Sequence, residues 1–351
     1  MEKTPFYDWH KAHASKMVTF AGYELPLSYS SIKEEHAAVR ERSGLFDISH
    51  MACFRLEGDK ALQILEMCTP RKIEKRAGKL QYNVILHEDG GIADDVTIFT
   101  KEEDKFIIIA NAANRQKLSQ IFTKEIKKNP AFLYEIKNYV LLALQGPQSE
   151  EVISSLWSVD DLYFYEGKEV NSCLLLRSGY TGEDGFEILA PQAEGMKLWQ
   201  HFLAKGVQPC GLAARDLLRL EAFYPLYGQE ISDHLTCASC RLGWLIDEDK
   251  VYYGKERILR EKASPPFVTL GFFLEEDGIP RPGYTVYAGE RPIGEVTSGS
   301  YSFLWERGFG LMRLKEVSFE ESLFLEIRSQ RKKISIVKKS PLKGSIKRRR
   351  F

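Results

Sequence analysis

Apolar positions in the first 130 residues follow a helical repeat in some stretches and an extended one in others. Ser31-Ile-Lys-Glu34 has the capping-box form, and the run after it reaches Gly44, so we expect a helix over 32–43. Apolar spacing predicts two more helices, at 59–68 and 113–127. Apolar runs between the helices predict strands at 45–48, 80–86, 92–100 and 106–110. A hairpin turn at 87–91 then leaves Asp94 and Asp95 among three successive strands.

The same kinds of element recur further along the chain. Strands are expected at 139–144, 174–177 and 186–189, and helices at 149–156 and 195–203. Because the strands cluster in hairpins, two α+β units side by side fit this order better than alternating parallel crossovers.

The pattern changes after Pro265, where short apolar runs are separated by Gly and Pro turns without a helical repeat. Strands are expected at 267–274, 284–287, 292–297, 308–312, 323–328 and 333–337. They predict a small β-barrel or sandwich. We therefore divide the chain into residues 1–263 with two intertwined α+β units, a barrel domain at 264–340, and a basic tail at 341–351.

Composition adds few constraints to this picture. The chain has 351 residues, 44% of them hydrophobic and 28% charged, as in an ordinary globular protein. No stretch approaches the roughly 18 to 20 apolar residues that span a bilayer, so no membrane role is expected. The N-terminus resembles neither a secretion signal nor a transit peptide. Six scattered cysteines suit reduced thiols, and a cytoplasmic location is expected.

Charge is distributed unevenly, although Lys+Arg and Asp+Glu both number 49. Residues 331–351 contain ten basic side chains and no acidic one, which leaves 39 basic and 49 acidic side chains in the first 330 residues. Such a tail could touch RNA, an acidic protein or a membrane surface. It has a single aromatic residue, Phe351, and no RNA-binding motif, so we expect a solvated or weakly docking tail without nucleic-acid binding.

Two adjacent carboxylates, Asp94 and Asp95, lie inside an apolar strand, where alternation sends one to each face. A carboxylate that points inward without water costs several kcal/mol unless it meets a cation or hydrogen-bond donors. It is therefore a candidate for binding a positively charged substrate or intermediate. In the alternative, Asp94 faces solvent and Asp95 caps a turn or pairs with an arginine.

A glycine-rich segment, Gly179 to Glu187, enters a predicted strand. Its glycines would let the backbone approach a flat ligand closely, and Glu187 would offer two acceptor oxygens to ring N–H groups. The alternative is a glycine-rich turn with a solvated acidic edge. The spacing does not match a dinucleotide-binding fingerprint or a phosphate-binding loop.

Further along the chain, Arg215 and Arg219 lie one turn apart on a predicted amphipathic helix. They could clamp a carboxylate or make ordinary ion pairs. Cys237 and Cys240 form a single Cys-x-x-Cys with one nearby histidine, His234. That falls short of a four-ligand zinc site, so buried thiols are expected.

Motifs spread over roughly residues 4–340 occur in one order: Thr4-Pro-Phe-Tyr-Asp8, Gly44-Leu-Phe-Asp-Ile-Ser-His-Met51, Glu88-Asp-Gly-Gly-Ile-Ala-Asp-Asp95, Asn111-Ala-Ala-Asn114, Gly179 to Glu187, Pro209-Cys-Gly-Leu-Ala-Ala-Arg-Asp216, Gly243-Trp244 and Val296-Thr-Ser-Gly299. This combination resembles the aminomethyltransferase (T-protein) family of the glycine cleavage system. The resemblance covers nearly the whole chain.

The resemblance implies a three-domain α+β cloverleaf, with two ferredoxin-like units around a central folate channel and a C-terminal β-barrel. It also implies an enzyme that moves the one-carbon unit of an aminomethyl group from the reduced lipoyl arm of H-protein to tetrahydrofolate, releasing ammonia. Tetrahydrofolate is then a co-substrate, H-protein is the partner, and no metal takes part.

Residue roles follow from the same resemblance. Asp95 matches the family's key catalytic carboxylate, Glu187 matches the residue that reads the pterin ring, and Arg215 matches the arginine of the folate site. Four further folate-site candidates lie in or beside matching motifs: Met51, Asn111, Tyr180 and Trp244.

The chain also departs from the family pattern. Pro70-Arg71 replaces the usual Thr-Asn, the turn at 302–308 is altered, and the tail lacks the usual Pro-Phe-Tyr. Three alternative functions stay open: an iron–sulfur-assembly-type folate-binding paralogue, the folate domain of a flavin-fused dehydrogenase, and a non-catalytic folate binder. The cysteine that the iron–sulfur-assembly type carries is missing from the matching segment 249–256 of this chain.

Overall fold

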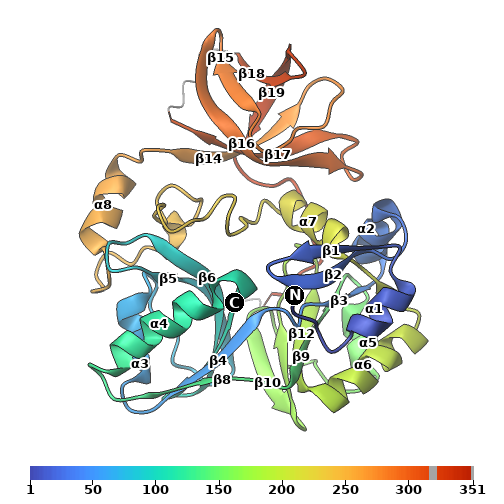
Figure 1. Ribbon diagram of the computed structural model, residues 1–351, viewed down its shortest axis with the longest axis vertical. Helices are drawn as coiled ribbons and strands as arrows, with labels where there is room; N and C mark the ends of the chain where they lie inside the picture. The colour runs from blue at the N-terminus through green and yellow to red at the C-terminus, as the bar shows by residue number, and fades with distance from the viewer. Residues whose placement is uncertain (316–321, 349–351) are drawn as a thin grey trace.

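Antiparallel strand pairing builds most of the protein, which is described by a computed structural model over residues 1–315 and 322–348. Two α+β units share one sheet of eleven strands, and a closed six-stranded barrel lies across one end of them (Figure 1). The mixed α+β class with a C-terminal barrel predicted from the sequence is therefore confirmed.

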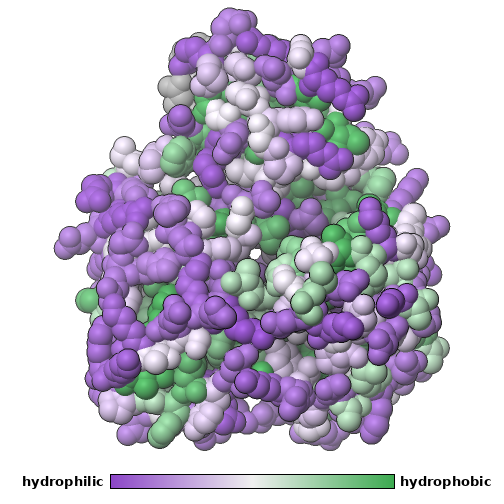
Figure 2. All heavy atoms as spheres, in the orientation of Figure 1, coloured by the Kyte–Doolittle hydropathy of each residue, from purple (hydrophilic) through white to green (hydrophobic). Residues whose placement is uncertain are grey.

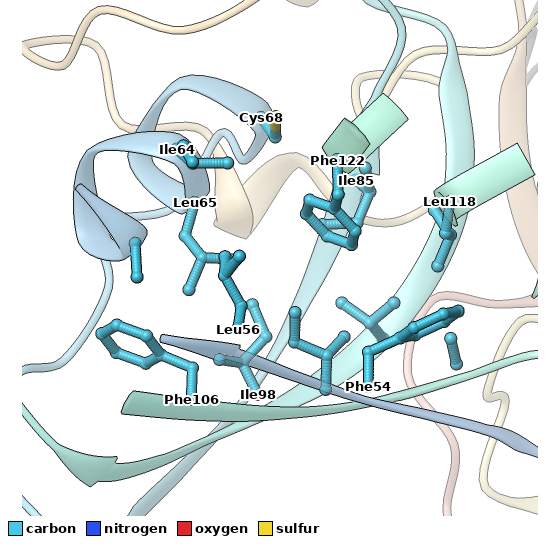
Figure 3. Packing of buried hydrophobic residues seen from close by; sticks show 14 of the residues in the cluster. Phe54, Leu56, Ile64, Leu65, Cys68, Ile85, Ile98, Phe106, Leu118 and Phe122 are labelled. Carbon is cyan, nitrogen blue, oxygen red and sulfur yellow. The ribbon is translucent and has the colours of Figure 1, made fainter. Parts of the chain in front are cut away.

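The first unit contains five neighbouring strands, β5 (Lys79–Leu86), β6 (Ile92–Glu102), β7 (Lys105–Ala110), β4 (Ala52–Glu57) and β8 (Phe132–Glu135). Helices α3 (Ala61–Cys68) and α4 (Arg115–Ile126), with the short η1 (Ala112–Asn114) before α4, cover one face of them. Figure 3 shows the core between them, where Phe54 and Phe106 of the strands meet Leu65 and Phe122 of the helices. This core fixes the hairpin that carries Asp94 and Asp95.

The second unit contains β3 (Gly44–Asp47), β9 (Tyr139–Gln145), β12 (Gly185–Pro191), β11 (Cys173–Arg177) and β10 (Glu166–Val170), with the short β13 (Gln208–Pro209) parallel to β3 at the edge. Its helices are α1 (Tyr7–His13), α5 (Ser149–Ser154) and α6 (Gln192–Ala204). Phe6, Phe186, Trp199 and Phe202 are fully buried in its core.

The two units are joined by the pairing of β10 with β5, where Glu166 lies opposite Lys79. The chain crosses between the units early, because β3 belongs to the second unit and β4 to the first. A shared apolar cluster that includes Ile48, Ile109, Leu141 and Leu176 packs between them. The units are therefore intertwined and cannot separate at a single linker.

A third layer connects the units to the barrel. It comprises the hairpin of β1 (Lys16–Phe20) and β2 (Tyr23–Ser28), helix α2 (Ile32–Glu41) and helix α7 (Leu212–Glu221). The predicted capping box is present, since Ser31 Oγ accepts from the Glu34 N–H at 3.2 Å and Glu34 accepts from the Ser31 N–H. Glu221 at the end of α7 accepts from His36 and Arg40 of α2 and from Ser302 of the barrel, so it ties three elements together.

The barrel closes in the order β14 (Val268–Leu274), β17 (Arg307–Leu314), β16 (Arg291–Ser302), β15 (Thr285–Ala288), β18 (Leu323–Ile327) and β19 (Gln330–Val337). Helix α8 (Lys255–Ala263) precedes it, and η2 (Gly243–Leu245) lies in the irregular segment between α7 and α8 (Figure 1). Phe309 and Leu311 of the barrel pack on Leu217, Leu220 and Phe223. This contact seats the barrel over the two units. The division at residues 263 and 340 remains a prediction.

Some elements differ from the sequence expectation. The pattern did not predict α1, α8, the β1–β2 hairpin, β4, β8 or β10, because each is a short segment with too few residues to establish a repeat. The predicted helix at 113–127 begins as a turn of η1 and continues as α4.

The described part of the predicted basic tail docks on the protein, although most of its residues stay exposed. Residues 338–348, here called the C-terminal strap, return from the barrel across the second unit and dock there. The Ser345 N–H donates to Glu183 at 2.9 Å, Lys347 donates to Glu150 at 2.5 Å, and the Phe164 N–H donates to the Lys347 carbonyl at 3.0 Å. Acidic side chains of the second unit thus hold the basic end of the chain. Residues 349–351, including Phe351, lie outside the described residues.

Across residues 1–315 and 322–348, no helix has the length and apolar character needed to cross a membrane.

Candidate active site

A cavity of about 1020 Å³ lies where the two α+β units, α7 and the barrel meet. Figure 2, drawn in the orientation of Figure 1, shows that the molecular surface is hollowed near its centre, below the barrel. The cavity wall contains all seven site residues predicted from the sequence: Met51, Asp95, Asn111, Tyr180, Glu187, Arg215 and Trp244. Six separate segments bring them together, so the tertiary structure assembles what the sequence disperses.

Of the two adjacent carboxylates, Asp95 lines this cavity and Asp94 is buried behind the wall. Asp94 is fully buried and accepts hydrogen bonds from the Asn111 N–H at 2.9 Å, Asn111 Nδ2 at 2.8 Å and Asn114 Nδ2 at 2.6 Å. Asp95 faces the cavity and accepts from Asn111 Nδ2 at 2.8 Å and from the Tyr82 hydroxyl at 3.1 Å. Asn111 therefore bridges both carboxylates. The alternative in which Asp94 faces solvent is wrong.

Burial raises the pKa of both carboxyls, and the neighbouring Asp95 charge raises that of Asp94 further. For Asp95, the hydrogen bonds from Tyr82 and Asn111 and the charge of Arg215 act in the opposite direction and lower its pKa. Burial and the Asp95 charge together raise the pKa of the Tyr82 hydroxyl, which therefore stays a donor. Burial outweighs these contacts, so the net pKa of Asp95 lies above its usual value, and the contacts limit the rise.

Glu187 lies on β12 and presents its carboxylate to the cavity. Its Oε2 accepts from the Ser178 hydroxyl at 2.7 Å, and within the described residues Oε1 has no hydrogen-bond donor. Burial raises the pKa of Glu187, while the Ser178 hydrogen bond and the Arg215 charge lower it. One carboxylate oxygen is thus available to an N–H group of a ligand.

The glycines of the segment before Glu187 allow close internal packing, and Gly179 also lines the cavity. A Cβ on Gly179 would lie 1.8 Å from Gln145 Oε1, and one on Gly182, whose φ is +81°, would lie 2.5 Å from Leu342 of the strap. The acidic edge of this segment is also not solvated. Glu183 and Asp184 are buried and pair with Arg40 and Arg177. The alternative of a solvated acidic edge is therefore wrong, whereas the close approach of this backbone to a flat ligand stays a prediction.

The two arginines of α7 have different surroundings. Arg219 pairs with Asp216 at 2.8 Å and with Glu230 at 3.2 Å, so it is a structural ion pair. Arg215 lines the cavity, lies 4.8 Å from the Tyr180 ring centroid, and pairs with no carboxylate among the described residues. Burial lowers the pKa of Arg215, although the group stays a cation at neutral pH. Arg215 is therefore a cavity cation that a ligand can use.

Tyr180 donates its hydroxyl to the Pro225 carbonyl, and its ring stacks with that of Tyr224 at 5.8 Å. The Met51 carbonyl accepts from the Tyr139 hydroxyl, which holds the turn before β4. Trp244 has 59% of its surface exposed at the cavity rim, and its ring lies 6.0 Å from that of Tyr82. These aromatic groups form flat, partly apolar walls.

Sequence reasoning did not assign roles to Tyr82, Asn114, Ser178 or His50, although all four contact the site or its carboxylates. Ser178 directly precedes the glycine-rich segment, and Asn114 is the last residue of the Asn111-Ala-Ala-Asn114 motif. Their place next to or inside these motifs was the signal by which the sequence could have indicated them. His50 lines the cavity, and its buried Nδ1 has no partner among the described residues. Burial and then the Arg215 charge lower the pKa of His50 to about 4, so its ring is neutral at neutral pH.

The cysteines lie away from this chemistry. All six are free and buried, and Cys237 and Cys240 pack in an apolar core. The described ranges contain no group of three or more His, Cys, Asp or Glu side chains arranged to hold a metal ion. The cavity thus combines the carboxylates of Asp95 and Glu187, the Arg215 cation, which has no carboxylate partner among the described residues, and aromatic walls. Such a site can bind a polar, flat ligand and stabilise positive charge.

Comparisons with known proteins agree with this architecture. The profile described as the GCVT N-terminal domain matches residues 6–250, and that of the glycine cleavage T-protein C-terminal barrel domain matches residues 268–343. An aminomethyltransferase of Aquifex aeolicus is 42% identical over 94% of this chain and 92% of its own length. One from Leptospira interrogans is 36% identical over 99% of both chains.

A crystal structure of glycine cleavage system aminomethyltransferase T from Bartonella henselae matches with a TM-score of 0.93, at 30% identity over 99% of both chains. Sequence motifs, domain profiles and fold thus agree over nearly the full length. The chain belongs to the glycine cleavage T-protein family of aminomethyltransferases.

Proposed function

We propose that this aminomethyltransferase transfers a one-carbon unit within its central cavity, with Asp95 as the catalytic carboxylate. The donor is the aminomethyl group on the reduced lipoyl arm of H-protein, the acceptor is tetrahydrofolate, and the products are 5,10-methylenetetrahydrofolate and ammonia. The observation that carries the proposal is the inward Asp95 carboxylate in a cavity that also presents Glu187 and the unpaired Arg215.

The donor set fits a reduced pterin. A pterin ring carries adjacent N–H groups that need acceptors, and Glu187 Oε1 is an acceptor without a donor among the described residues. Ser178 fixes the carboxylate by its 2.7 Å bond to Oε2. A mismatched ring would leave this buried acceptor unpaired at a cost of about 1–3 kcal/mol. Glu187 is therefore the specificity residue in the proposal, with Tyr180, Met51 and Trp244 as the apolar and aromatic walls.

Asp95 acts through its negative charge. As the bond between the transferred carbon and its donor loosens, positive charge builds up on that carbon, and a carboxylate shielded from water stabilises it more than a solvated one would. Tyr82 and Asn111 hold Asp95 in place before the reaction, so no reorganisation is needed. Arg215 contributes by lowering the pKa of Asp95 and by orienting the acceptor.

Orientation supplies much of the remaining acceleration. Holding the acceptor nitrogen against the carbon converts an encounter of two molecules into a reaction within one complex. The cavity wall includes groups from both α+β units, α7 and the barrel, so the acceptor is surrounded. The six free thiols fit a reducing compartment, and the proposal places the reaction in the cytoplasm.

Ammonia release from aminomethylated H-protein on addition of tetrahydrofolate tests the proposal. Wild-type protein should release ammonia, and Asp95→Asn, which keeps the size and removes the charge, should lower kcat by about 10²–10³-fold. Near-normal release by Asp95→Asn would contradict the role of its charge. Absence of release by the wild type would instead favour a non-catalytic folate-binding paralogue.

A further inference from the structure

The strand that carries the proposed catalytic carboxylate contains an extra residue. Two consecutive residues of β5 lie opposite Asp94 and Ile92, so the residue between these two, Ala93, is a bulge on β6. A change of register by one residue sends every following side chain to the opposite face of a sheet, and bulges next to active sites re-aim side chains in this way. The bulge at Ala93 therefore decides that Asp95 faces the cavity while Asp94 is buried behind the wall.

One side of the helical segment after β7 supplies donors to this bulge and to the two carboxylates that follow it. Asn111, Asn114 and Lys117 are spaced three residues apart across η1 and α4, so their side chains leave the segment on the same side. The two asparagines hold the carboxylates. Lys117 Nζ donates to the Ala93 carbonyl at 3.1 Å. Together the three side chains fix three consecutive residues of β6.

Lys117 is itself fixed by the irregular segment that follows α7. Its Nζ donates to the Asp233 carboxylate at 2.7 Å and to the Tyr227 hydroxyl at 2.8 Å. His87, at the start of the hairpin turn, lies 2.6 Å from the same Asp233 oxygen. Burial raises the pKa of Asp233, but the hydrogen bonds from Lys117 and His87 outweigh burial, so the net pKa is lowered. Asp233 is therefore ionised at neutral pH and anchors the Lys117 ammonium.

The same irregular segment contacts the residue before the bulge. The Ile92 N–H donates to the Leu235 carbonyl at 3.0 Å, and the Ile92 carbonyl lies 3.4 Å from the Tyr227 hydroxyl. The described residues that line the cavity include Tyr227 but not Lys117. Lys117 thus lies behind the cavity wall and connects the bulge to a cavity-lining residue of another segment.

We propose that Lys117 is a positioning residue for the one-carbon transfer, because by holding the carbonyl of the Ala93 bulge it keeps the Asp95 carboxylate directed at the transferred carbon. The inference rests on the proposed function, since it takes Asp95 as the catalytic carboxylate. A small displacement of a catalytic group lowers the rate strongly. The pterin contact at Glu187 comes from a different strand, β12, and is unaffected. Loss of Lys117 should therefore slow the transfer and leave folate binding intact.

Steady-state ammonia release and equilibrium binding of tetrahydrofolate to the full-length protein test this role. Lys117→Met keeps the length of the side chain and removes its donor, so it should lower kcat about 10- to 100-fold while the dissociation constant for tetrahydrofolate changes less than about twofold. Lys117→Gln, whose amide nitrogen ends one atom short of the lysine ammonium, is a second variant that should behave in the same way. Thermal unfolding of each variant reports whether it is folded.

A double-mutant cycle with Asp95→Asn distinguishes positioning from a general loss of structure. If Lys117 acts through the Asp95 charge, Lys117→Met should lower kcat less than about threefold once that charge is absent. A loss as large as the one in the wild-type background would overturn the proposal.

Lys124→Met is the matched control. Lys124 lies two turns further along α4 and donates to Glu88, in the hairpin turn before β6, at 2.7 Å. Both side chains of this pair are exposed, so the pair lies on the surface. The control variant should keep the wild-type kcat.

Hydrogen exchange measured by mass spectrometry tests the contact without turnover. In Lys117→Met the amides of residues 92–95 should exchange about tenfold faster than in wild type, whereas in Lys124→Met their rates should not change. Unchanged exchange in folded Lys117→Met, or an unchanged kcat, would overturn the positioning role. Failure of the proposed function is a separate result, because it appears as absent ammonia release by the wild type or near-normal release by Asp95→Asn, whereas exchange rates are measured without substrate.

Discussion

The Asn111 side chain links the cavity-lining carboxylate of Asp95 to the buried carboxylate of Asp94. Its Nδ2 donates to Asp94 Oδ1 and to Asp95 Oδ1, both at 2.8 Å, while its backbone N–H donates separately to Asp94. Asn111→Ala removes the side-chain donor and keeps the backbone one. A hydrogen bond to a charged group contributes about 1.5–3 kcal/mol, and water in the cavity replaces part of it. We expect a loss of about 2–4 kcal/mol of stability.

The same substitution shifts the pKa of Asp95. The lost bond stabilises the ionised carboxylate, and one pKa unit corresponds to about 1.4 kcal/mol, so the pKa should rise by about one to two units. The ionised form is the active one in the proposal, so activity falls as pH falls through this pKa. The acid limb of kcat/KM for ammonia release should therefore move to higher pH by about the same amount.

Asn114→Ala is the control, because Asn114 Nδ2 donates only to Asp94 Oδ1, at 2.6 Å. Burial and the Asp95 charge already raise the pKa of Asp94 to about 8, so Asp94 is largely neutral below that pH, and losing this donor leaves the charge beside Asp95 nearly unchanged. The control should lose stability, yet its acid limb should stay in place or move to lower pH. The reasoning would be refuted if the acid limb of the kcat/KM profile stayed in place in Asn111→Ala, or if it moved to higher pH by the same amount in both variants.

Three further predictions concern other parts of the protein. Glu187→Gln should raise the dissociation constant for tetrahydrofolate about 10- to 100-fold in equilibrium titration, because one of the two carboxylate oxygens that accept hydrogen bonds becomes an NH₂ donor. An unchanged dissociation constant would mean that Glu187 does not contact the pterin ring. Burial raises the pKa of Glu221, but the hydrogen bond from His36 and the charges of His36 and Arg40 outweigh burial, so the net pKa is lowered. In urea unfolding at pH 7, Glu221→Gln should therefore lower the free energy of unfolding by about 3 kcal/mol, and this difference from wild type should shrink as the pH falls below about 4. A difference that does not depend on pH would contradict the role of an ionised Glu221. Ser345→Ala removes the hydroxyl that donates to Glu183 at 2.8 Å and accepts from the Asp184 N–H at 3.0 Å. Trypsin should therefore cleave the strap after Lys343 and Lys347 faster in this variant than in wild type. Equal cleavage rates would argue against a docked strap.

Local patterns determined the kinds of element and the family. The capping box at Ser31, the hairpin before Asp94 and the helical spacing of α4 depend on residues close in sequence, and the structure contains each of them. The order of motifs along the chain was enough to indicate the family, because each motif keeps its own short spacing.

Only the tertiary structure decided what each polar group meets. Arg215 and Arg219 look alike in sequence, yet Arg219 meets Glu230 while Arg215 faces the cavity without a carboxylate among the described residues. The strap likewise docks on Glu150 and Glu183, far away in sequence. Periodicity reports which side of an element is apolar, whereas the partner of a charge depends on which distant segment packs against that side. That choice depends on the whole chain, so no local pattern encodes it.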